Sequence, residues 1–387
     1  MQLDLNPVKQ RFQEFVYSCS TTSLDFRLTP RADTSLYATC FAIYSLQLVR
    51  TLHKIEDKNA LAIHLKNGLR SKRPSDPLER QAKPYRQLLT FCLSALAVLD
   101  ELKNDPLEDL VSEQIENDIK GYLQQAGVLN GRAGSGNQAM FSAIFMIHAR
   151  DYLGMPIHSK LGEWVETHIK HMNHFGFWGD PLHMTHLQFQ NGYHQHEILE
   201  YLGIDNPQLE QTLPAIRRLA DPEGHFAPYP GGGGCYDYDA AFMLTPEGHM
   251  PDDPTHQLLL RTTCKIIAEQ NQDGGFAESI RVRPRSLEGL RMIASHVVDA
   301  LGNKALFAER LRYGLTLQRS KHNRIHTHWS QYSREWGESD LWDSWFRMLA
   351  LARIDVALHP ERAGHWGFID YPGIGYHPSL RANKVIG

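Results

Sequence analysis

The segment LYATCFAIYSLQLV, residues 36–49, is the first of a series of short apolar segments that recur at roughly 50-residue spacing. The later members are LLTFCLSALAVLDEL (88–102), NQAMFSAIFMIHARDYLG (137–154), NGYHQHEILEYLG (191–203), YDAAFMLT (238–245), LRMIASHVVDALG (290–302) and LWDSWFRMLALARI (341–354). More polar helical segments lie between them, at 111–125, 160–174, 206–220 and 256–270. The alternation predicts buried apolar helices and solvent-facing polar helices, because a helix that is apolar on every side must be buried.

The repeated helix pair also predicts the fold class. Alternating β-branched runs between tight turns, which indicate strands, are nearly absent. Helix pairs at such spacing form either an open solenoid or a closed α/α toroid. A solenoid has short, uniform turns, whereas here long segments rich in Gly, Pro and aromatic residues precede apolar helices, at 175–190, 221–236, 271–286 and 321–340. We therefore predict an all-α protein, an α/α toroid of about six helical hairpins that forms a single domain over 1–387, with 365–387 as an irregular C-terminal tail.

Composition excludes several classes of partner. The net charge is −4 with both signs scattered along the chain, which predicts no nucleic-acid partner and no polybasic arm for membranes. The N-terminus lacks the build of a signal peptide, and no apolar run reaches the length of a membrane span. The five cysteines are far apart and include no CxxC pair. The sequence thus indicates a cytoplasmic protein with no integral membrane segment, and it carries no signal for an oligomeric state.

The stretch GHFAPYPGGGGCYDYDAAFML, from Gly224 to Leu244, contains the first candidate site. Asp237 and Asp239 stand at the start of its apolar run, where carboxylates are costly to bury unless they are paired or protonated. Two nearby carboxyl groups repel each other's charge, so one can keep its proton and act as a general acid. The alternative is a helix N-cap, in which an Asp accepts backbone N–H bonds. The run Gly231–Gly234 is predicted to be a flexible connector, or a lid over a pocket.

Two short motifs in the sequence carry a resemblance to a known family. The segment QNQDGGF, residues 270–276, with the degenerate copy DPEGHFAP at 221–228, resembles the QxxDGGF/W repeat of the terpenoid cyclase and protein prenyltransferase superfamily. The segment DYDAA, residues 237–241, resembles the DxDD(T/S)A element of class II terpene cyclases, although Ala240 replaces the third aspartate. Most class II cyclases pair two helical domains, whereas this chain is a single unit. The zinc ligands of the prenyltransferases have no clear match here.

The resemblance implies an enzyme that begins the cyclisation or isomerisation of an isoprenoid-like small molecule by protonating it. Asp239 is then the general acid, and Asp237 is the partner that hydrogen-bonds it and adjusts its pKa. The pocket residues expected to bind the substrate and to stabilise positive charge are Tyr236, Tyr238, Phe226, Trp342, Trp345 and Asp340. This protonation chemistry requires no cofactor and no metal.

Two other functions remain open at the level of the sequence. The group Asn191, Tyr193 and either His194 or His196 resembles the site of a polysaccharide lyase, in which an amide neutralises a uronate while Tyr or His moves the proton. A carbohydrate-active toroid, either a lyase or a glycoside hydrolase, is therefore the first alternative. A helical-repeat scaffold that binds a partner without catalysis is the second. Seven histidines lie between residues 168 and 196, but their spacing matches no zinc signature. They are predicted to be surface or loop residues rather than metal ligands.

Overall fold

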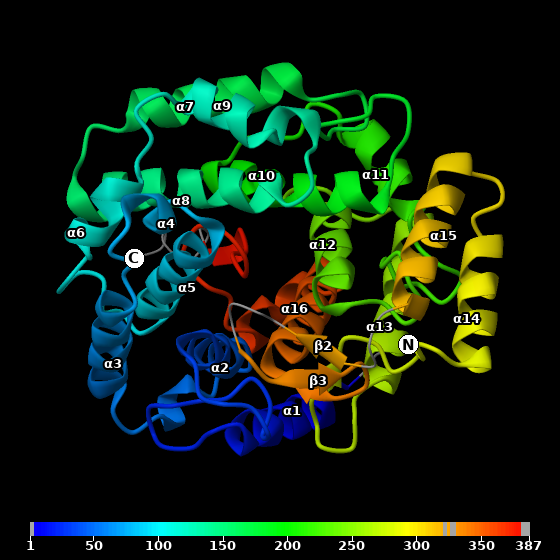
Figure 1. The fold of residues 1–387 in the computed structure, drawn as a ribbon, viewed down its shortest axis with the longest axis horizontal. Helices are drawn as coiled ribbons and strands as arrows, with labels where there is room; N and C mark the ends of the chain where they lie inside the picture. Colours follow the sequence, from blue (N-terminus) through cyan, green and yellow to red (C-terminus); the bar gives the residue numbers. More distant parts are fainter. Residues whose placement is uncertain (1–3, 320–322, 326–329, 381–387) are drawn as a thin grey trace. The chain divides into compact units, whose positions relative to one another are not determined.

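The computed structural model describes residues 4–319, 323–325 and 330–380, and its regular secondary structure is mostly helical, as predicted (Figure 1). The chain divides into two compact units. The first comprises Met1–His53, His183–His186 and Leu213–Gly367, and the second comprises Lys54–Leu182, Leu187–Thr212 and Phe368–Gly387. Each unit is therefore assembled from segments that are distant in the sequence. No helix in the described part of the chain is long and apolar enough to cross a membrane.

The first unit has α12 and α16 at its centre. Its helices are α1 (Asn6–Ser18), α2 (Leu36–Leu48), α12 (Gly234–Leu244), α13 (Asp253–Ala268), α14 (Leu287–Val298), α15 (Lys304–Arg319) and α16 (Leu341–Leu358), followed by the 3₁₀ helix η4 (Pro360–His365). Helix α16 packs against α12, α2 and α13, and α14 packs against α15 (Figure 1). Two short antiparallel ladders join loops of this unit. They pair β1 (Phe276–Ala277) with β4 (Ser339–Asp340) and β2 (Asn323–Ile325) with β3 (Ser333–Glu335).

The second unit is built around α8. Its helices are α3 (Lys58–Ser71), α4 (Pro77–Arg80), α5 (Lys83–Val98), α6 (Glu108–Val111), α7 (Ile119–Ala126), α8 (Ser135–Leu153), α9 (His158–His171) and most of α10 (His186–Leu202), and it includes the first residues of α11 (Leu209–Arg217). Helix α8 contacts α5, α6, α7 and α9. The C-terminal tail follows no regular structure over residues 366–378, and Tyr371 in it hydrogen-bonds His148 of α8 at 3.0 Å. Residues 381–387 of the predicted tail lie outside the described residues.

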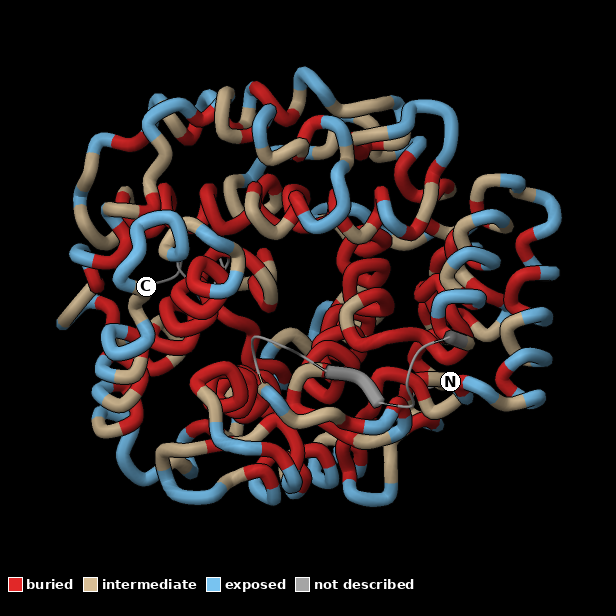
Figure 2. Tube along the Cα trace, in the orientation of Figure 1, coloured by how far each residue is buried: buried red, intermediate tan, exposed pale blue. Residues whose placement is uncertain are grey.

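Burial follows the predicted alternation, with one exception. Helices α2, α5, α8, α12 and α16, which coincide with the predicted apolar segments, are buried over most of their length (Figure 2). The segment 290–302 is the exception. It lies mostly in α14, yet Leu290, Val298 and Leu301 are exposed to solvent. The prediction that this apolar helix is buried is wrong, because the helix packs along only one side, against α15.

The predicted repeat appears in the structure as a recurring turn. At Asn173–Phe177, Asp221–His225 and Asn271–Gly275 the N–H of the first residue donates to the carbonyl of the fifth, at 2.7–2.9 Å. The fourth residue in each is a glycine with positive φ, and its N–H donates back to the first residue's carbonyl. A left-handed conformation is open to glycine at little cost. The turn thus recurs close to the predicted spacing, including one copy, at Asn173, that the sequence motif did not reveal.

Candidate functional site

Both candidate aspartates lie inside helix α12 rather than at its cap. The helix begins at Gly234, and its N-cap residue, Gly233, makes no side-chain capping bond. Asp237 and Asp239 are each 0 % exposed. The alternative interpretation as helix caps is therefore wrong. Both carboxyl groups are buried within the helix, where each requires a stabilising environment.

Asp237 is held by three groups. Its Oδ2 lies 2.9 Å from Nδ1 of His225 and accepts a hydrogen bond from the guanidinium of Arg347. Its Oδ1 accepts the backbone N–H of Phe226 at 3.0 Å. Nε2 of His225 is 3.2 Å from a carboxylate oxygen of Glu269. We define these four residues as one buried ionic cluster: Asp237, His225, Arg347 and Glu269. They come from α12, the loop before it, α16 and the C-terminal end of α13, respectively.

The charges of this cluster follow from its geometry. Burial disfavours the charged imidazole of His225, but the carboxylates of Asp237 and Glu269 overcome that penalty and raise its pKa to about 10. Burial likewise opposes the ionisation of Asp237, yet the charges of His225 and Arg347 lower its pKa below the usual value. His225 is therefore an imidazolium and Asp237 a carboxylate at neutral pH. Asp237 is not the protonated member of the pair.

Asp239 lies on a different face of α12 from Asp237. Residues two positions apart on an α-helix do not face each other, since each step turns the helix by about 100°. Asp237 points to His225 and Arg347, so Asp239 points away from this ionic cluster. The predicted hydrogen bond from Asp237 to Asp239 does not fit this geometry. Asp239 belongs to a helix of which nearly every residue is buried in the protein.

The glycine run Gly231–Gly234 is packed, not flexible. All four residues are buried, and Arg347 donates to the carbonyl of Gly231 at 2.8 Å. A Cβ added at Gly232 would lie 2.8 Å from atoms of the ionic cluster, and one at Gly233 would lie 2.0 Å from the hydroxyl of Tyr229. The prediction of a flexible connector or lid is therefore wrong. The glycines are needed because the backbone lies directly against charged and phenolic groups.

A second group of buried charges surrounds Arg334. Its guanidinium is 2.5 Å from Asp340, 2.8 Å from Asp343 and 3.5 Å from Glu278. Asp340 also caps α16, since its side chain accepts the N–H of Asp343 at 2.8 Å. Burial raises the pKa of Asp340, and the charge of Arg334 opposes that shift. Asp340, predicted to bind substrate, thus has the contacts of a helix cap and an ion-pair partner.

The predicted aromatic residues of the first unit pack mainly on one another. The ring of Trp345 lies 5.0 Å from Tyr44 and 4.9 Å from Phe346, and Tyr238 lies 5.7 Å from Phe346. Trp342 is 4.4 Å from Phe346 and 5.2 Å from Phe41. These are ordinary separations for edge-on and offset aromatic pairs. Helices α2, α12 and α16 thus share a continuous aromatic cluster.

The other two predicted aromatic residues flank the glycine run. Tyr236 is 7 % exposed, and its ring meets those of Tyr229 and His186 edge-on. Phe226 is fully buried, and its backbone N–H is the donor to Asp237.

The residues of the alternative carbohydrate site lie close together in the second unit, but their polar groups contact other parts of the protein. Asn191 accepts the N–H of Gly134 at 2.9 Å and donates to the carbonyl of Gly131 at 3.3 Å. The ring of His194 is tilted against that of Tyr193, with centroids 4.1 Å apart, and lies 3.0 Å from the side-chain nitrogen of Asn137. Burial lowers the pKa of His194 to about 3. The amide predicted to neutralise a uronate is therefore engaged with a loop of the protein itself.

The histidines between residues 168 and 196 include several that are buried, contrary to prediction. His168 bonds the carbonyl of Trp164 at 2.7 Å, and His196 bonds the carbonyl of Gly176 at 2.7 Å. Burial lowers the pKa of His168 to about 3 and that of His196 to about 4, so both rings are neutral. The two rings therefore bond different backbone carbonyls and do not converge on one point. Among the residues that the structure describes, no group of three His, Cys, Asp or Glu is placed to hold a metal ion.

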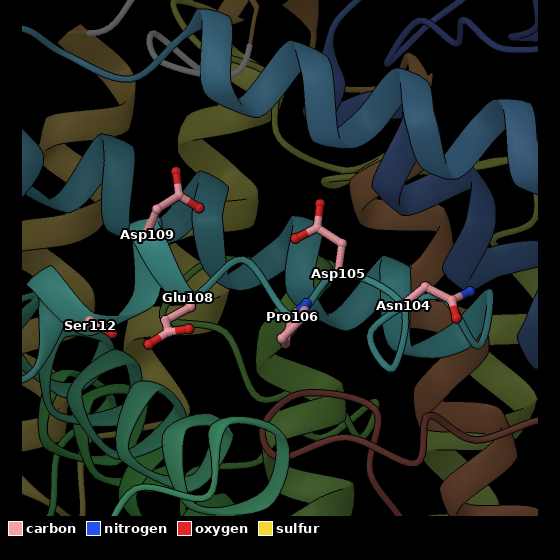
Figure 3. A pocket seen from close by; sticks show the side chains of 6 residues that line it. All are labelled: Asn104, Asp105, Pro106, Glu108, Asp109 and Ser112. Atoms are coloured by element: carbon pink, nitrogen blue, oxygen red, sulfur yellow. The ribbon is translucent and has the colours of Figure 1, made fainter.

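A hollow on the second unit contains none of the predicted site residues. It opens beside α6 and is lined by Asn104, Asp105, Pro106, Glu108, Asp109 and Ser112 (Figure 3). Arg70 contacts two of its carboxylates, at 3.0 Å and 3.8 Å. This acidic depression is open to solvent and is neutralised in part by that arginine.

Sequence reasoning missed His225, Arg347 and Glu269 as partners of Asp237. Arg347 is separated from Asp237 by 110 positions, so no local pattern connects them. One signal was present. Arg347 interrupts the apolar run LWDSWFRMLALARI, and an arginine buried on such a helix must have a carboxylate partner.

Comparison with known families identifies the class of protein. The sequence matches the family described as "Prenyltransferase alpha-alpha toroid domain" over residues 2–75 and 122–286, which is more than half of the chain. The chain therefore belongs to this family, and the predicted all-α toroid is confirmed as its fold class. The predicted resemblance to terpenoid cyclases and prenyltransferases is confirmed at the same, remote level. No curated protein sequence matches the chain.

Solved structures of one enzyme share the fold. The apo type II terpene cyclase MstE from Scytonema is 13 % identical with a TM-score of 0.51, over 93 % of this chain and 99 % of that one. A variant of the same cyclase in complex with geranylgeranyl dihydroxybenzoate, its substrate, is 14 % identical with a TM-score of 0.51, over 92 % and 97 % of the two chains. A second variant, without ligand, has a TM-score of 0.53 at 13 % identity. Identities this low establish a common fold.

Proposed function

We propose that the protein is an enzyme resembling type II terpene cyclases, in which Asp239 protonates an isoprenoid-like substrate and so begins its cyclisation or isomerisation. The observation that carries the proposal is the position of Asp239. It is a fully buried carboxyl in the interior of α12, within the DYDAA element, and it does not cap the helix. The proposal requires Asp239 to carry a proton, because only the neutral carboxyl group can donate one to a substrate.

Asp237 has a different role in this proposal from the one expected from the sequence. It is ionised and fixed by His225, Arg347 and the N–H of Phe226, so it cannot share a proton with Asp239. Instead the ionic cluster anchors the first turns of α12 to α16 and to the preceding loop. Asp237 is thus a positioning residue, which sets the orientation of the helix that presents Asp239.

The aromatic cluster supports a substrate that becomes positively charged. Protonation of an alkene leaves a carbocation, and aromatic faces stabilise cations. The rings of Tyr238, Trp342 and Trp345 lie on α12 and α16, the helix that carries Asp239 and its packing partner. The related fold of a cyclase that binds geranylgeranyl dihydroxybenzoate supports a polyprenyl chain as the substrate class.

The test is product formation from polyprenyl substrates by Asp239→Asn and the wild type. The substitution keeps the shape of the side chain and removes the proton donor, so we expect turnover to fall by about 10²–10⁴-fold. The matched control is Asp252→Asn, which removes a carboxylate that caps α13 in the same unit. The control should retain turnover. Full activity in Asp239→Asn, with product formed by the wild type, would contradict the assignment of the acid.

The role of Asp237 has a separate readout. His225→Gln and Asp237→Asn keep hydrogen-bonding groups but remove charges from the ionic cluster. We expect a lower kcat, an unchanged pH profile for the acid limb of kcat, and a lower melting temperature. A shift of that acid limb in Asp237→Asn would instead make Asp237 the titrating group.

A further inference from the structure

The helical hairpin α14–α15 exposes a set of large apolar side chains. Six such residues on α14, α15 and the link between them have exposed fractions of 38–77 %; they are Leu287, Leu290, Val298, Leu301, Leu311 and Leu315. The two helices do pack on each other, since a Cβ at Gly314 would meet the side chain of Ile293. The exposed parts of these apolar side chains therefore lie outside the hairpin's own interface. We call these six residues the leucine face.

The spacing of the leucine face is that of an amphipathic helix. On α14 and just beyond it, Leu290, Val298 and Leu301 follow one another with steps that return to the same side of a helix. On α15, Leu311 and Leu315 are four positions apart, one turn of helix. Scattered surface leucines need no explanation, but stripes on two packed helices do. The hairpin also follows residue 286, where the family match ends.

Basic side chains accompany this face. The exposed ones between residues 283 and 312 are Arg283, Arg285, Arg291, Lys304 and Arg312. The exposed acids over the same range are Glu288 and Asp299, and Asp299 is 3.1 Å from Arg310. The chain as a whole has a net charge of −4. The hairpin is thus a local basic region on an acidic protein, which the scattered charges of the sequence did not indicate.

We propose that the α14–α15 hairpin binds the surface of an anionic phospholipid membrane. Exposed leucines flanked by arginines are the composition of helices that lie in a bilayer interface, with the apolar side in the acyl boundary and the cations at the headgroups. A second copy of this chain is a poorer partner for the leucine face. Two such faces in contact would bring together five basic side chains from each copy, which repel one another. This inference does not depend on the proposed cyclase activity.

Vesicle flotation of the full chain tests the proposal. The probe is phosphatidylcholine vesicles with and without phosphatidylglycerol, at low and high salt. We expect binding to the anionic vesicles, weaker binding to phosphatidylcholine alone, and weakening by salt, which screens the arginines. Leu290→Ser with Leu301→Ser should lower the affinity by about ten-fold or more, since burial of apolar groups drives insertion. Arg291→Gln with Arg312→Gln should remove the preference for anionic vesicles.

The control uses leucines of the second unit. Leu78 and Leu182 are 80 % and 75 % exposed, and Leu78→Ser with Leu182→Ser should leave vesicle binding unchanged. No binding to anionic vesicles, or equal loss in this control, would overturn the proposal. Sedimentation velocity tests whether a second copy of this chain binds the leucine face instead. A dimer abolished by the Leu290/Leu301 change, without vesicle binding, would assign the leucine face to a second copy.

Discussion

One buried histidine of the first unit, His225, and three of the second are in opposite electrostatic states. In the first unit His225 lies between Asp237 and Glu269, and its pKa is raised to about 10. In the second unit His168, His194 and His196 are also buried, and each pKa is lowered to about 3 or 4. His168 and His196 bond backbone carbonyls, whereas His194 lies 3.0 Å from the amide of Asn137 and 3.8 Å from a carboxylate oxygen of Glu197. Burial alone therefore does not set the charge of a histidine. His225 stays charged because carboxylate oxygens within 3.2 Å of both its ring nitrogens offset the loss of hydration.

Acidification should produce the largest change in the free energy of unfolding, and it should distinguish the neutral histidines of the second unit from the charged His225. The unfolded pKa of histidine is about 6.5, so the unfolded chain takes up protons before the neutral histidines of the second unit do. Stability is therefore lost as the pH falls below about 6.5 and towards 4, by an amount on the order of several kcal/mol. Histidine proton signals in NMR and far-UV circular dichroism measure this. Titration of these histidines near pH 6.5 in the folded protein would break the comparison.

His225 should behave in the opposite way. Its folded pKa lies above the unfolded value, so its contribution is fully present below about pH 6.5 and is lost as the pH rises through 10. The same NMR series should show the His225 ring protonated across the neutral range.

Removal of the cation that pairs with Asp237 should give the next largest effect. Arg347→Met removes the guanidinium from Asp237, which then keeps His225 as its counter-ion, while Glu269 keeps His225 and Arg281. We expect a loss of about 3–5 kcal/mol in the free energy of unfolding, measured by urea denaturation. A loss below 1 kcal/mol would mean that this ionic cluster does not depend on its arginine.

The glycine run sharpens the comparison through a matched pair. Gly232 and Gly248 have φ of +77° and +73°, so alanine is strained to the same degree at both. A Cβ at Gly248 meets nothing within 4 Å, whereas one at Gly232 meets Arg347, Asp237 and His225 at 2.8 Å. Gly232→Ala should therefore cost about 1–3 kcal/mol more than Gly248→Ala in the same denaturation experiment. Equal costs would show that the cluster moves aside freely.

An exposed ion pair should give the smallest effect. Lys103 and Asp100 are 3.3 Å apart, with side chains 76 % and 82 % exposed. Lys103→Met should change the free energy of unfolding by less than about 1 kcal/mol, because water screens the pair. A larger change would show that burial does not explain why the Arg347–Asp237 pair contributes more to stability than an exposed pair.

The sequence predicted the helices more fully than the site. The apolar run 36–49 became α2 (Leu36–Leu48), and 341–354 became the first part of α16, because a helix buried on all sides is visible in composition alone. The segment 290–302 misled for the same reason, since apolar composition does not reveal which sides of a helix find partners. A leucine at the surface and a leucine in the core look alike in the sequence.

The site was predictable only in part. Asp237 and Asp239 were found from their cost of burial, and both are buried. Their separation onto different faces followed from helix geometry once the start of α12 was known. The partners of Asp237 could not be found, because His225 precedes it in a loop and Arg347 lies on a helix 110 residues later. Such pairings depend on tertiary contacts, which no local pattern records.

The run Gly231–Gly234 has a consequence for how the gene can change. Every amino-acid substitution at a glycine introduces a larger side chain, since no residue is smaller. At each of these four positions the added atom would come within 2.0–2.8 Å of a neighbouring side chain. The four codons therefore form a stretch with no conservative replacement, and a deep mutational scan should show it as a continuous block of intolerance. Diversification of this protein would then have to proceed through the residues around the run rather than through the run itself.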